Sequence, residues 1–230
     1  MLSKAAGRRR RLFRAPWMHV VLALVVVALV QGLFVKVYQV PSGSMEQTLN
    51  VGDRILVNRT AYASAGPVRG DVVVFGKPVS WGPAPERGSV RTALGWIGEV
   101  TSIGPGNTEY LVKRIIGLPG DTVACCGIGG QLQVNGAVVA ESYIYQDVPF
   151  RSGSVDCSTA VKSQRCFNPI RLGEDQYLVM GDHRSNSGDS VAACRGAAAA
   201  ADCVKTVQRA DITGRVEWLV FPVDKWGGIK

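Results

Sequence analysis

The chain has 230 residues and a formal net charge of +8. This length suits one large buried core, or a core with a smaller lobe, and no segment recurs at a fixed period, which excludes a repeat architecture. The positive charge is concentrated in a basic tail at Lys4, Arg8, Arg9, Arg10, Arg11 and Arg14. The remainder is nearly neutral, so the basic pI belongs to the tail and we expect no nucleic-acid partner.

An apolar run follows the tail, from Trp17 to Val35. As a helix it would rise about 28 Å, close to the hydrocarbon thickness of a bilayer. We therefore expect residues 1–15 to be a cytoplasmic tail, residues 16–36 a single transmembrane anchor in membrane lipid, and residues 37–230 an extracytoplasmic domain. A cleavable signal peptide also begins with basic residues, but this run is long for one and no small-x-small site follows it.

Short strands separated by turns are predicted for the rest of the chain, with few helical patterns, so the fold class is mostly β. Asn135-Gly136 predicts a tight hairpin turn. Segments 77–107 and 157–174 are expected to be irregular, and the alanine run at 197–201 a helix fragment or a loop. The predicted strands are 54–57, 71–76, 110–116, 131–134, 137–139, 176–180 and 212–221.

Six cysteines in an extracytoplasmic domain predict disulfides rather than free thiols. Cys157 and Cys166 are nine residues apart, as are Cys194 and Cys203, so each pair would close a compact loop. The adjacent cysteines at 125–126 are free, bonded to each other, or paired elsewhere. A zinc site is the alternative, but the chain has no C-x-x-C and only two histidines, so we expect no metal.

The shortage of histidine restricts the chemistry. His19 lies in the apolar run, so a Ser-His protease would have to use His183. A serine nucleophile would otherwise need a different base. Gly43 between Ser42 and Ser44 would let the backbone turn tightly, with the Ser42 hydroxyl and the Ser44 amide facing an oxyanion, although such a quartet is also an ordinary turn.

Lys113 lies in the apolar strand 110–116. It either points outward into solvent or is buried, in which case desolvation lowers its pKa from about 10.4 and makes it a usable general base. Arg114 stays charged and would face the other side of the strand. The polar segment 181–190 is a solvated loop or a source of hydroxyls and carboxylates that orient the lysine.

Four motifs, in this order behind one apolar segment, resemble those of bacterial type I signal peptidases. The resemblance spans residues 31–222 and includes Gly214-Arg215 near its end. The motifs are Pro41-Ser42-Gly43-Ser44-Met45 with Leu49; Gly52-Asp53-Arg54; Lys113-Arg114 with Gly117-Leu118-Pro119-Gly120-Asp121; and Gly181-Asp182 with Arg184, Asn186, Ser187 and Asp189.

The resemblance implies a membrane-bound serine endopeptidase that removes signal peptides from exported preproteins without a cofactor. Ser44 would be the nucleophile and Lys113 the general base, and Ser42 would complete the oxyanion hole with the Ser44 amide. Ser187 would hydrogen-bond Lys113, and Asp182 would support the site. Asp189 would pair with Arg184. The apolar substrate-binding residues would be Tyr38, Val40, Met45, Leu49, Leu111 and Val112.

The resemblance also implies twisted antiparallel sheets with a second lobe inserted at about 122–175. Three supporting positions depart from the family pattern: His183 replaces the common Asn, Ser185 the common Asp, and Val191 a usual arginine. Two alternatives are a maturation protease of the same fold with a narrow substrate, and an inactive homologue that binds leaders without cutting. A self-cleaving repressor would carry a helix-turn-helix domain where this chain has its apolar run.

Overall fold

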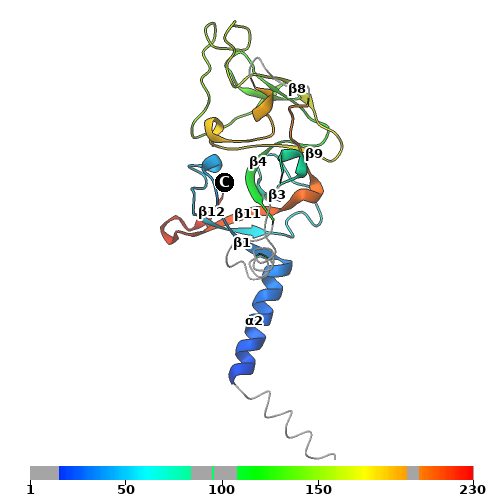
Figure 1. Cartoon of the computed structure of the whole chain (residues 1–230), viewed down its shortest axis with the longest axis vertical. Coiled ribbons are helices and arrows are strands. Elements are labelled where there is room, and N and C mark those ends of the chain that lie inside the picture. Colours follow the sequence, from blue (N-terminus) through cyan, green and yellow to red (C-terminus); the bar gives the residue numbers. More distant parts are fainter. Residues whose placement is uncertain (1–15, 84–94, 96–107, 196–201, 230) are drawn as a thin grey trace, which may run out of the picture.

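The computed structural model describes residues 16–83, 95, 108–195 and 202–229. A long helix, α2 (Pro16–Leu33), leads into a β domain made of two antiparallel sheets (Figure 1). The predicted fold class is therefore confirmed as mostly β with antiparallel sheets. The basic tail, most of the segment 77–107 and the whole alanine run at 197–201 lie outside the described residues.

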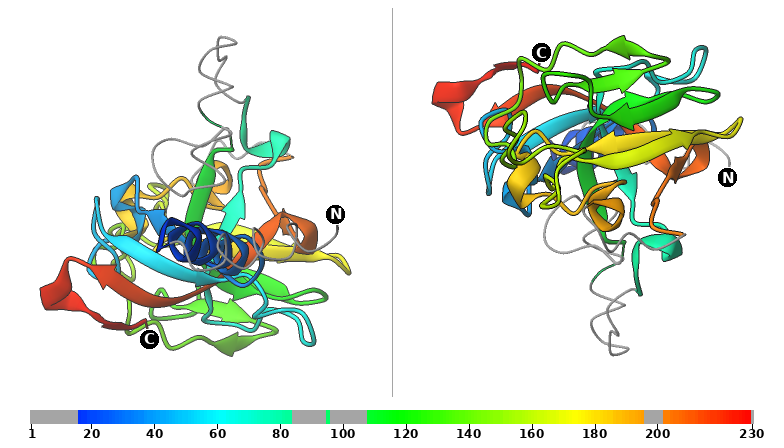
Figure 2. Two further views of the ribbon diagram at one scale, coloured as in Figure 1. Left: turned by 90° about the horizontal axis from the view of Figure 1, so that it is seen from below. Right: turned by 90° about the horizontal axis from the view of Figure 1, so that it is seen from above.

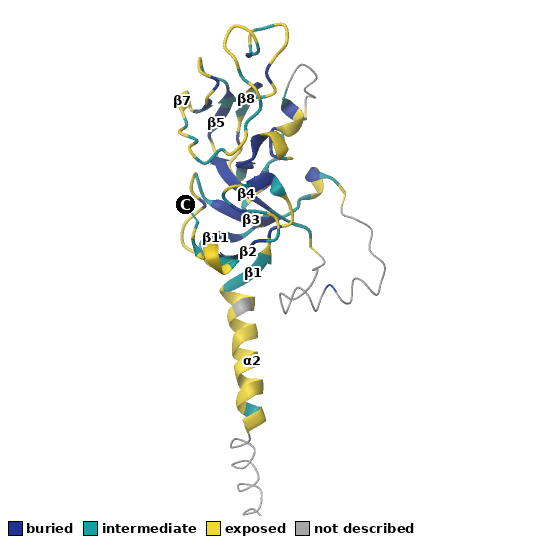
Figure 3. Ribbon diagram, turned by 90° about the vertical axis from the view of Figure 1, so that its left-hand side faces the viewer, coloured by how far each residue is buried: buried dark blue, intermediate teal, exposed yellow. Residues whose placement is uncertain are grey.

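The side chains of α2 are apolar on every side and exposed to the surroundings of the protein (Figure 3). Its valines and leucines are between 42% and 63% exposed. Searched for membrane-crossing helices, the described part of the chain yields none of sufficient length and apolar character. The helix ends at Leu33, short of the predicted boundary at residue 36, because Val35 and Lys36 already pair with the neighbouring strand.

The first sheet is the larger one and carries most of the domain core. Its strands run in the order β1-β2-β11-β3-β4-β9-β10, with β12 paired to β11. Figure 2 shows α2 nearly end-on, beneath the strands of this sheet. The bounds are β1 (Val35–Gln39), β2 (Arg54–Asn58), β3 (Val72–Gly76), β4 (Tyr110–Gly117), β9 (Gln176–Met180), β10 (Val207–Gln208), β11 (Ile212–Phe221) and β12 (Gly227–Gly228).

A close backbone approach fixes how the longest strand lies in this sheet. β11 pairs with both β2 and β3, with register shifts along its length. At Gly214 any Cβ would collide with the carbonyl oxygen of Asn58 in β2. Glycine is required here because the two backbones touch directly.

The second sheet is built from residues between 122 and 171 and lies at the end of the domain away from α2 (Figure 1). Asn135 and Gly136 both have positive φ, 53° and 81°, as the predicted hairpin turn requires. The prediction of an irregular segment at 157–174 is wrong where β8 pairs with β5, because this strand is only partly buried and lacks an apolar pattern. The bounds are β5 (Thr122–Cys125), β6 (Leu132–Val134), β7 (Ala137–Val138) and β8 (Phe167–Arg171).

Three disulfides tie the loops of the described chain. Cys157 bonds Cys166 and Cys194 bonds Cys203, as the spacing predicted. The pair at 125–126 forms the third bond, which settles the alternative that the sequence left open. The disulfides Cys157–Cys166 and Cys125–Cys126 belong to the second sheet and its loops. Cys194 packs into the apolar core between the sheets.

Candidate active site

Ser44 lies in a short 3₁₀ turn, η1 (Gly43–Met45), directly after the first strand of the large sheet. The turn is anchored from below because Met45 is fully buried in the core. Ser44 is itself only 5% exposed, and its Oγ lies 3.4 Å from the Oγ of Ser42. The structure therefore places the two predicted serine hydroxyls side by side.

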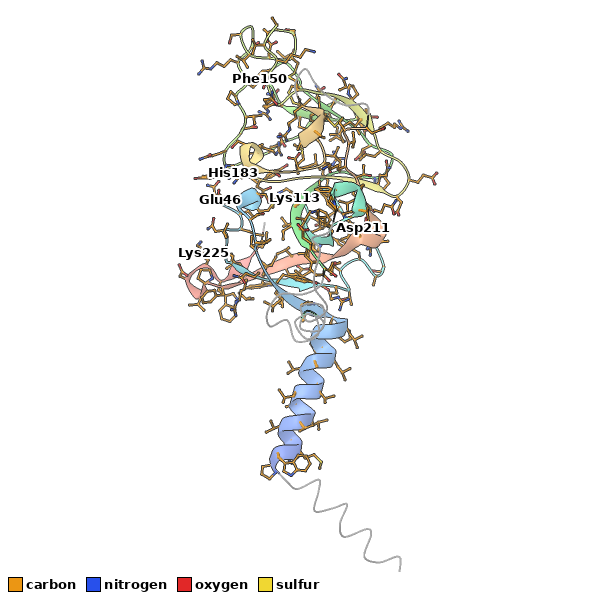
Figure 4. The ribbon with its side chains drawn as sticks, viewed as in Figure 1. Glu46, Lys113, Phe150, His183, Asp211 and Lys225 are labelled. Carbon is orange, nitrogen blue, oxygen red and sulfur yellow. A yellow bond between two sulfur atoms is a disulfide. The ribbon has the colours of Figure 1, made fainter. Side chains whose placement is uncertain are left out.

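Lys113 reaches the same point from β4. Its Nζ and the Oγ of Ser44 are joined by a hydrogen bond of 2.5 Å, although the two residues are 69 positions apart in the chain. Figure 4 shows Lys113 at the centre of the domain, on the side where Glu46 and His183 also lie. Of the two orientations that the sequence allowed, the structure has the buried one, since Lys113 is only 3% exposed.

Burial changes the chemistry of this lysine. Desolvation lowers the pKa of Lys113 to about 8, against the opposing effect of the nearby Asp189 and Asp182 carboxylates. A lysine with this pKa is substantially neutral at pH 8, whereas an ordinary lysine is almost fully protonated. The amine can therefore accept a proton from the hydroxyl that it contacts.

Arg114, the next residue in β4, is buried as well and makes a bidentate ion pair with Asp182. Its Nε and Nη2 donate to the two carboxylate oxygens at 2.9 and 2.7 Å. Thr48 Oγ1 donates to the same carboxylate at 2.6 Å, which connects the turn after Ser44 to this pair. This partner of Arg114 was not predicted, because nothing in the sequence spacing brings residue 182 next to residue 114.

The segment that follows β9 holds the backbone of Ser44. The amide of His183 donates to the carbonyl oxygen of Ser44 at 3.1 Å. At Gly181, a Cβ would collide with that same carbonyl oxygen, so only glycine lets the segment approach so closely. The predicted polar segment 181–190 is thus packed against the Ser44 backbone and is not a solvated loop in its first half.

His183 adds a side-chain contact to the same turn. Its Nδ1 lies 2.6 Å from Oε2 of Glu46, and its ring meets Tyr145 edge-on. Figure 4 labels Glu46 and His183 next to one another, to the left of Lys113. The His183 ring therefore bonds the Glu46 carboxylate, whereas the Ser44 hydroxyl bonds Lys113, so the geometry does not favour His183 as the base.

Two predicted supporting contacts are not formed. Ser187 Oγ is buried without a hydrogen-bond partner among the described residues, because it packs against Gly181 and does not reach Lys113. The predicted Asp189–Arg184 pair is wrong, because Arg184 bonds Glu141 of the second lobe instead.

Asp189 pairs with a residue that the sequence analysis did not consider. Arg195 Nη2 lies 2.9 Å from Asp189 Oδ2, and both side chains are buried. Charge alone could not have identified Arg195 as the partner, since Arg184 is similarly close to Asp189 in the sequence, five residues before it against six residues after.

The predicted substrate-binding residues are partly brought together. One core cluster contains most of them, and Leu111 packs against a different cluster that includes Phe75 and Ile115. The members of the first cluster are Val40, Met45, Leu49 and Val112, with Tyr38 packed against it. Their role in binding substrate stays a prediction.

Within the described chain, one group of residues has ligand atoms close enough to share a metal ion: Cys126, Cys157 and Cys166. All three sulfurs are taken up in disulfides, so they are not available as thiolate ligands. This group lies in the second lobe and contributes nothing to the Ser44–Lys113 site.

A buried serine hydroxyl bonded to a lysine of lowered pKa defines the class of serine hydrolase that uses lysine as its base. Residues 14–221 match the family model described as signal peptidase, peptidase S26. The chain therefore belongs to the signal peptidase family. The predictions of a signal peptidase and of a serine endopeptidase are confirmed.

Individual relatives agree with this assignment. A signal peptidase I of Mycobacterium tuberculosis is 33% identical over 91% of this chain and 73% of its own length. A probable signal peptidase I of Mycobacterium leprae is 32% identical over 94% of this chain and 79% of its own. The crystal structure of a signal peptidase I from Enterococcus faecalis covers 65% of this chain and 96% of that chain, at 22% identity and a TM-score of 0.34, too low for an element-by-element comparison.

The Arg114–Asp182 pair predicts a stability effect. Asp182→Asn leaves a buried guanidinium without its carboxylate, so the free energy of unfolding should fall by about 3 kcal/mol or more. Urea unfolding of the variant, followed by circular dichroism, measures this loss. Asp175→Asn, an exposed carboxylate ahead of β9, is the matched control and should stay close to the wild type. Equal stability of the two variants would contradict the prediction.

Proposed function

We propose that this chain removes signal peptides from exported preproteins through a Ser44–Lys113 dyad and an acyl-enzyme intermediate. The observation that supports this most strongly is the 2.5 Å hydrogen bond between a buried lysine amine and a buried serine hydroxyl, in a chain of the signal peptidase family. Activation of the serine hydroxyl by the lysine amine needs no metal or cofactor.

The first half-reaction would begin with neutral Lys113. Its Nζ takes the proton of the Ser44 hydroxyl while Oγ attacks the carbonyl carbon of the scissile peptide bond. The oxygen of that carbonyl becomes an oxyanion, for which the Ser44 amide and the Ser42 hydroxyl are the donors. The C–N bond then breaks, and the lysine returns the proton to the leaving amine, which releases the mature protein.

The second half-reaction would regenerate the enzyme. Lys113, neutral again, removes a proton from a water molecule that attacks the Ser44 ester. The ester C–O bond breaks, Ser44 recovers its proton from the lysine, and the leader departs with a new carboxylate. Asp182 would hold Arg114 beside the dyad throughout, while Asp189 would set the electrostatic field at the lysine.

Substrate selection would depend on the apolar side chains next to Ser44. We assign Tyr38, Val40, Met45, Leu49, Leu111 and Val112 to contacts with small residues at positions −3 and −1 of the leader. In this structure Met45 and Leu49 are fully buried.

We also propose that α2 anchors the enzyme in a cell membrane, with the basic tail cytoplasmic and the β domain on the opposite side. The helix is about 27 Å long and covered by exposed valine and leucine side chains, which are stable in lipid and costly in water. Ser44 follows Leu33 closely in the chain, so the active site would open near the bilayer surface. Substrates held in the membrane by their own leader would meet it there.

Two alternatives remain distinguishable by substrate. A maturation protease of the same fold would cut one narrow class of preprotein, and an inactive homologue would bind leaders without cutting. The buried neutral lysine favours an enzyme, because a binding protein gains nothing from the cost of desolvating an amine.

The dyad is tested by cleavage of a preprotein with an Ala-x-Ala leader in detergent. Ser44→Ala and Lys113→Met should each lower kcat by about a thousandfold or more, since each removes a group that acts in both half-reactions. The product site is read by mass spectrometry and should follow the second alanine. Ser154→Ala and Lys162→Met, at exposed positions, are the matched controls. An inert wild type on several such leaders would instead support the binding or narrow-substrate alternatives.

The pH dependence follows from the lysine. Lys113 acts only when neutral, and its pKa is about 8, so kcat/KM should be low at pH 6 and rise through a midpoint near pH 8. Initial rates between pH 6 and pH 10 measure this limb. A midpoint near pH 6.5 would contradict the assignment and point to a histidine base instead.

The anchor is tested by flotation of the full chain with liposomes of mixed neutral and anionic lipid. The wild type should float with the lipid, and Val25→Lys should do so much less, because a lysine at the centre of a spanning helix costs about 3 kcal/mol. Val161→Lys, at an exposed valine outside α2, is the control and should float like the wild type. A wild type that stays in the aqueous fraction would refute the anchor.

A further inference from the structure

Asp189 is a carboxylate near Lys113 whose partner, Arg195, lies outside all four sequence motifs. It is 1% exposed, and burial raises the pKa of its carboxyl while Arg195, the Val191 amide, Arg184 and Lys113 lower it. An unpaired charge at such a depth is strongly unfavourable. The position two residues beyond Asp189 is occupied by Val191, which is fully buried in the core and carries no charge.

Arg195 supplies the missing positive charge. Its Nη2 lies 2.9 Å from Asp189 Oδ2, and its Nη1 donates to the carbonyl oxygen of Arg184 at 3.2 Å. The guanidinium therefore bridges the two ends of the segment that lies between β9 and η4 (Ala192–Cys194). The nearest other arginine, Arg184, is engaged with Glu141 and with the carbonyl oxygen of Gly181.

The backbone of Arg195 is fixed by a disulfide. Cys194, directly before it, is 4% exposed, packs in the core and bonds Cys203 with a Cα–Cα separation of 4.9 Å. Beyond Cys203 the chain is held again, because Lys205 N donates to the carbonyl oxygen of Ser190. Ser190, the residue next to Asp189, is thus hydrogen-bonded to the chain that follows Cys203.

We propose that Arg195 is a positioning residue for the reaction, held by the Cys194–Cys203 disulfide so that its guanidinium neutralises Asp189 and leaves Lys113 free to act as the base. This inference rests on the proposed function of the Ser44–Lys113 dyad. The disulfide links the oxidised state of the chain to the electrostatics of the active site. It gives this cysteine pair a purpose that the sequence motifs do not.

The charges around the lysine make the direction of the effect definite. The groups that act on Lys113 are the carboxylates of Asp182 and Asp189, both of which favour its protonated form. Asp182 is already paired with Arg114. When Arg195 is removed, Asp189 becomes the uncompensated charge, and the pKa of Lys113 rises.

The test measures the titration of Lys113 in two ways on the full chain in detergent. The first is the midpoint of the kcat/KM–pH profile, and the second is the NMR titration of ¹³C-labelled lysine, with the Lys113 signal identified by its loss in Lys113→Met. Arg195→Ala should move both midpoints upward by about one unit, which lowers kcat/KM at pH 7 by about tenfold. Arg195→Lys should restore most of the shift.

Asp189→Asn should move the midpoint downward, and adding Arg195→Ala to it should then have no further effect on the midpoint. The double variant Cys194→Ser/Cys203→Ser should reproduce the upward shift of Arg195→Ala. Its matched control is Cys157→Ser/Cys166→Ser, a disulfide with the same sequence separation of 9 in the second lobe, which should leave the midpoint in place.

The inference is overturned if Arg195→Ala loses activity or stability while both midpoints stay where they are, since that is the result of a purely structural role. The role of the disulfide is overturned if Cys194→Ser/Cys203→Ser has the same midpoint as the wild type, as its control is expected to have. If the Cys194→Ser/Cys203→Ser chain does not fold, Arg195→Ala with the disulfide intact still decides the first part. Failure of the proposed function looks different, because the wild type then cuts no leader while the NMR titration can still be read.

Discussion

The burial of the Lys113 amine is the constraint on which the site depends. A charged ammonium at 3% exposure would lose most of its hydration, and this desolvation lowers the pKa of Lys113 to about 8. The same burial brings the amine within 2.5 Å of the Ser44 hydroxyl. Each carboxylate near the dyad must then be neutralised by a cation, because an unpaired carboxylate would raise the pKa of Lys113 and favour its protonated form.

Two ion pairs neutralise the carboxylates near Lys113, and a different structural element positions the arginine of each pair. Asp182 is neutralised by Arg114, the residue next to Lys113 in β4, so that the base and this cation are positioned by one strand. Asp189 is neutralised by Arg195, which is positioned by a disulfide. Replacing such pairs by apolar residues is often neutral for stability, so their presence is better explained by their effect on the lysine than by a stabilising contribution of their own.

The sheet topology explains how such distant segments meet. β4 lies between β3 and β9, so the residues that follow β9 emerge beside Lys113. The turn after β1 is drawn to the same place by the buried Met45 and Leu49 side chains. Glycine at position 181 then lets the segment after β9 touch the Ser44 backbone. Glu141, in the connection that follows β7 of the second sheet, pairs with Arg184.

The sequence alone determined the β class, most strands of the large sheet and two of the three disulfides, and it singled out Ser44 and Lys113, which the structure brings into contact. These follow from local patterns: β-branched runs, a turn with Asn-Gly, short cysteine spacings, and motifs in a fixed order. The partners of the supporting charges were decided only by the tertiary structure. Asp189 has Arg184 five residues before it and Arg195 six residues after it, and sequence distance cannot choose between them. The partner of Asp189 depends on which arginine is already paired with another carboxylate. Arg184 is paired with Glu141, which is 43 residues away from it in the sequence.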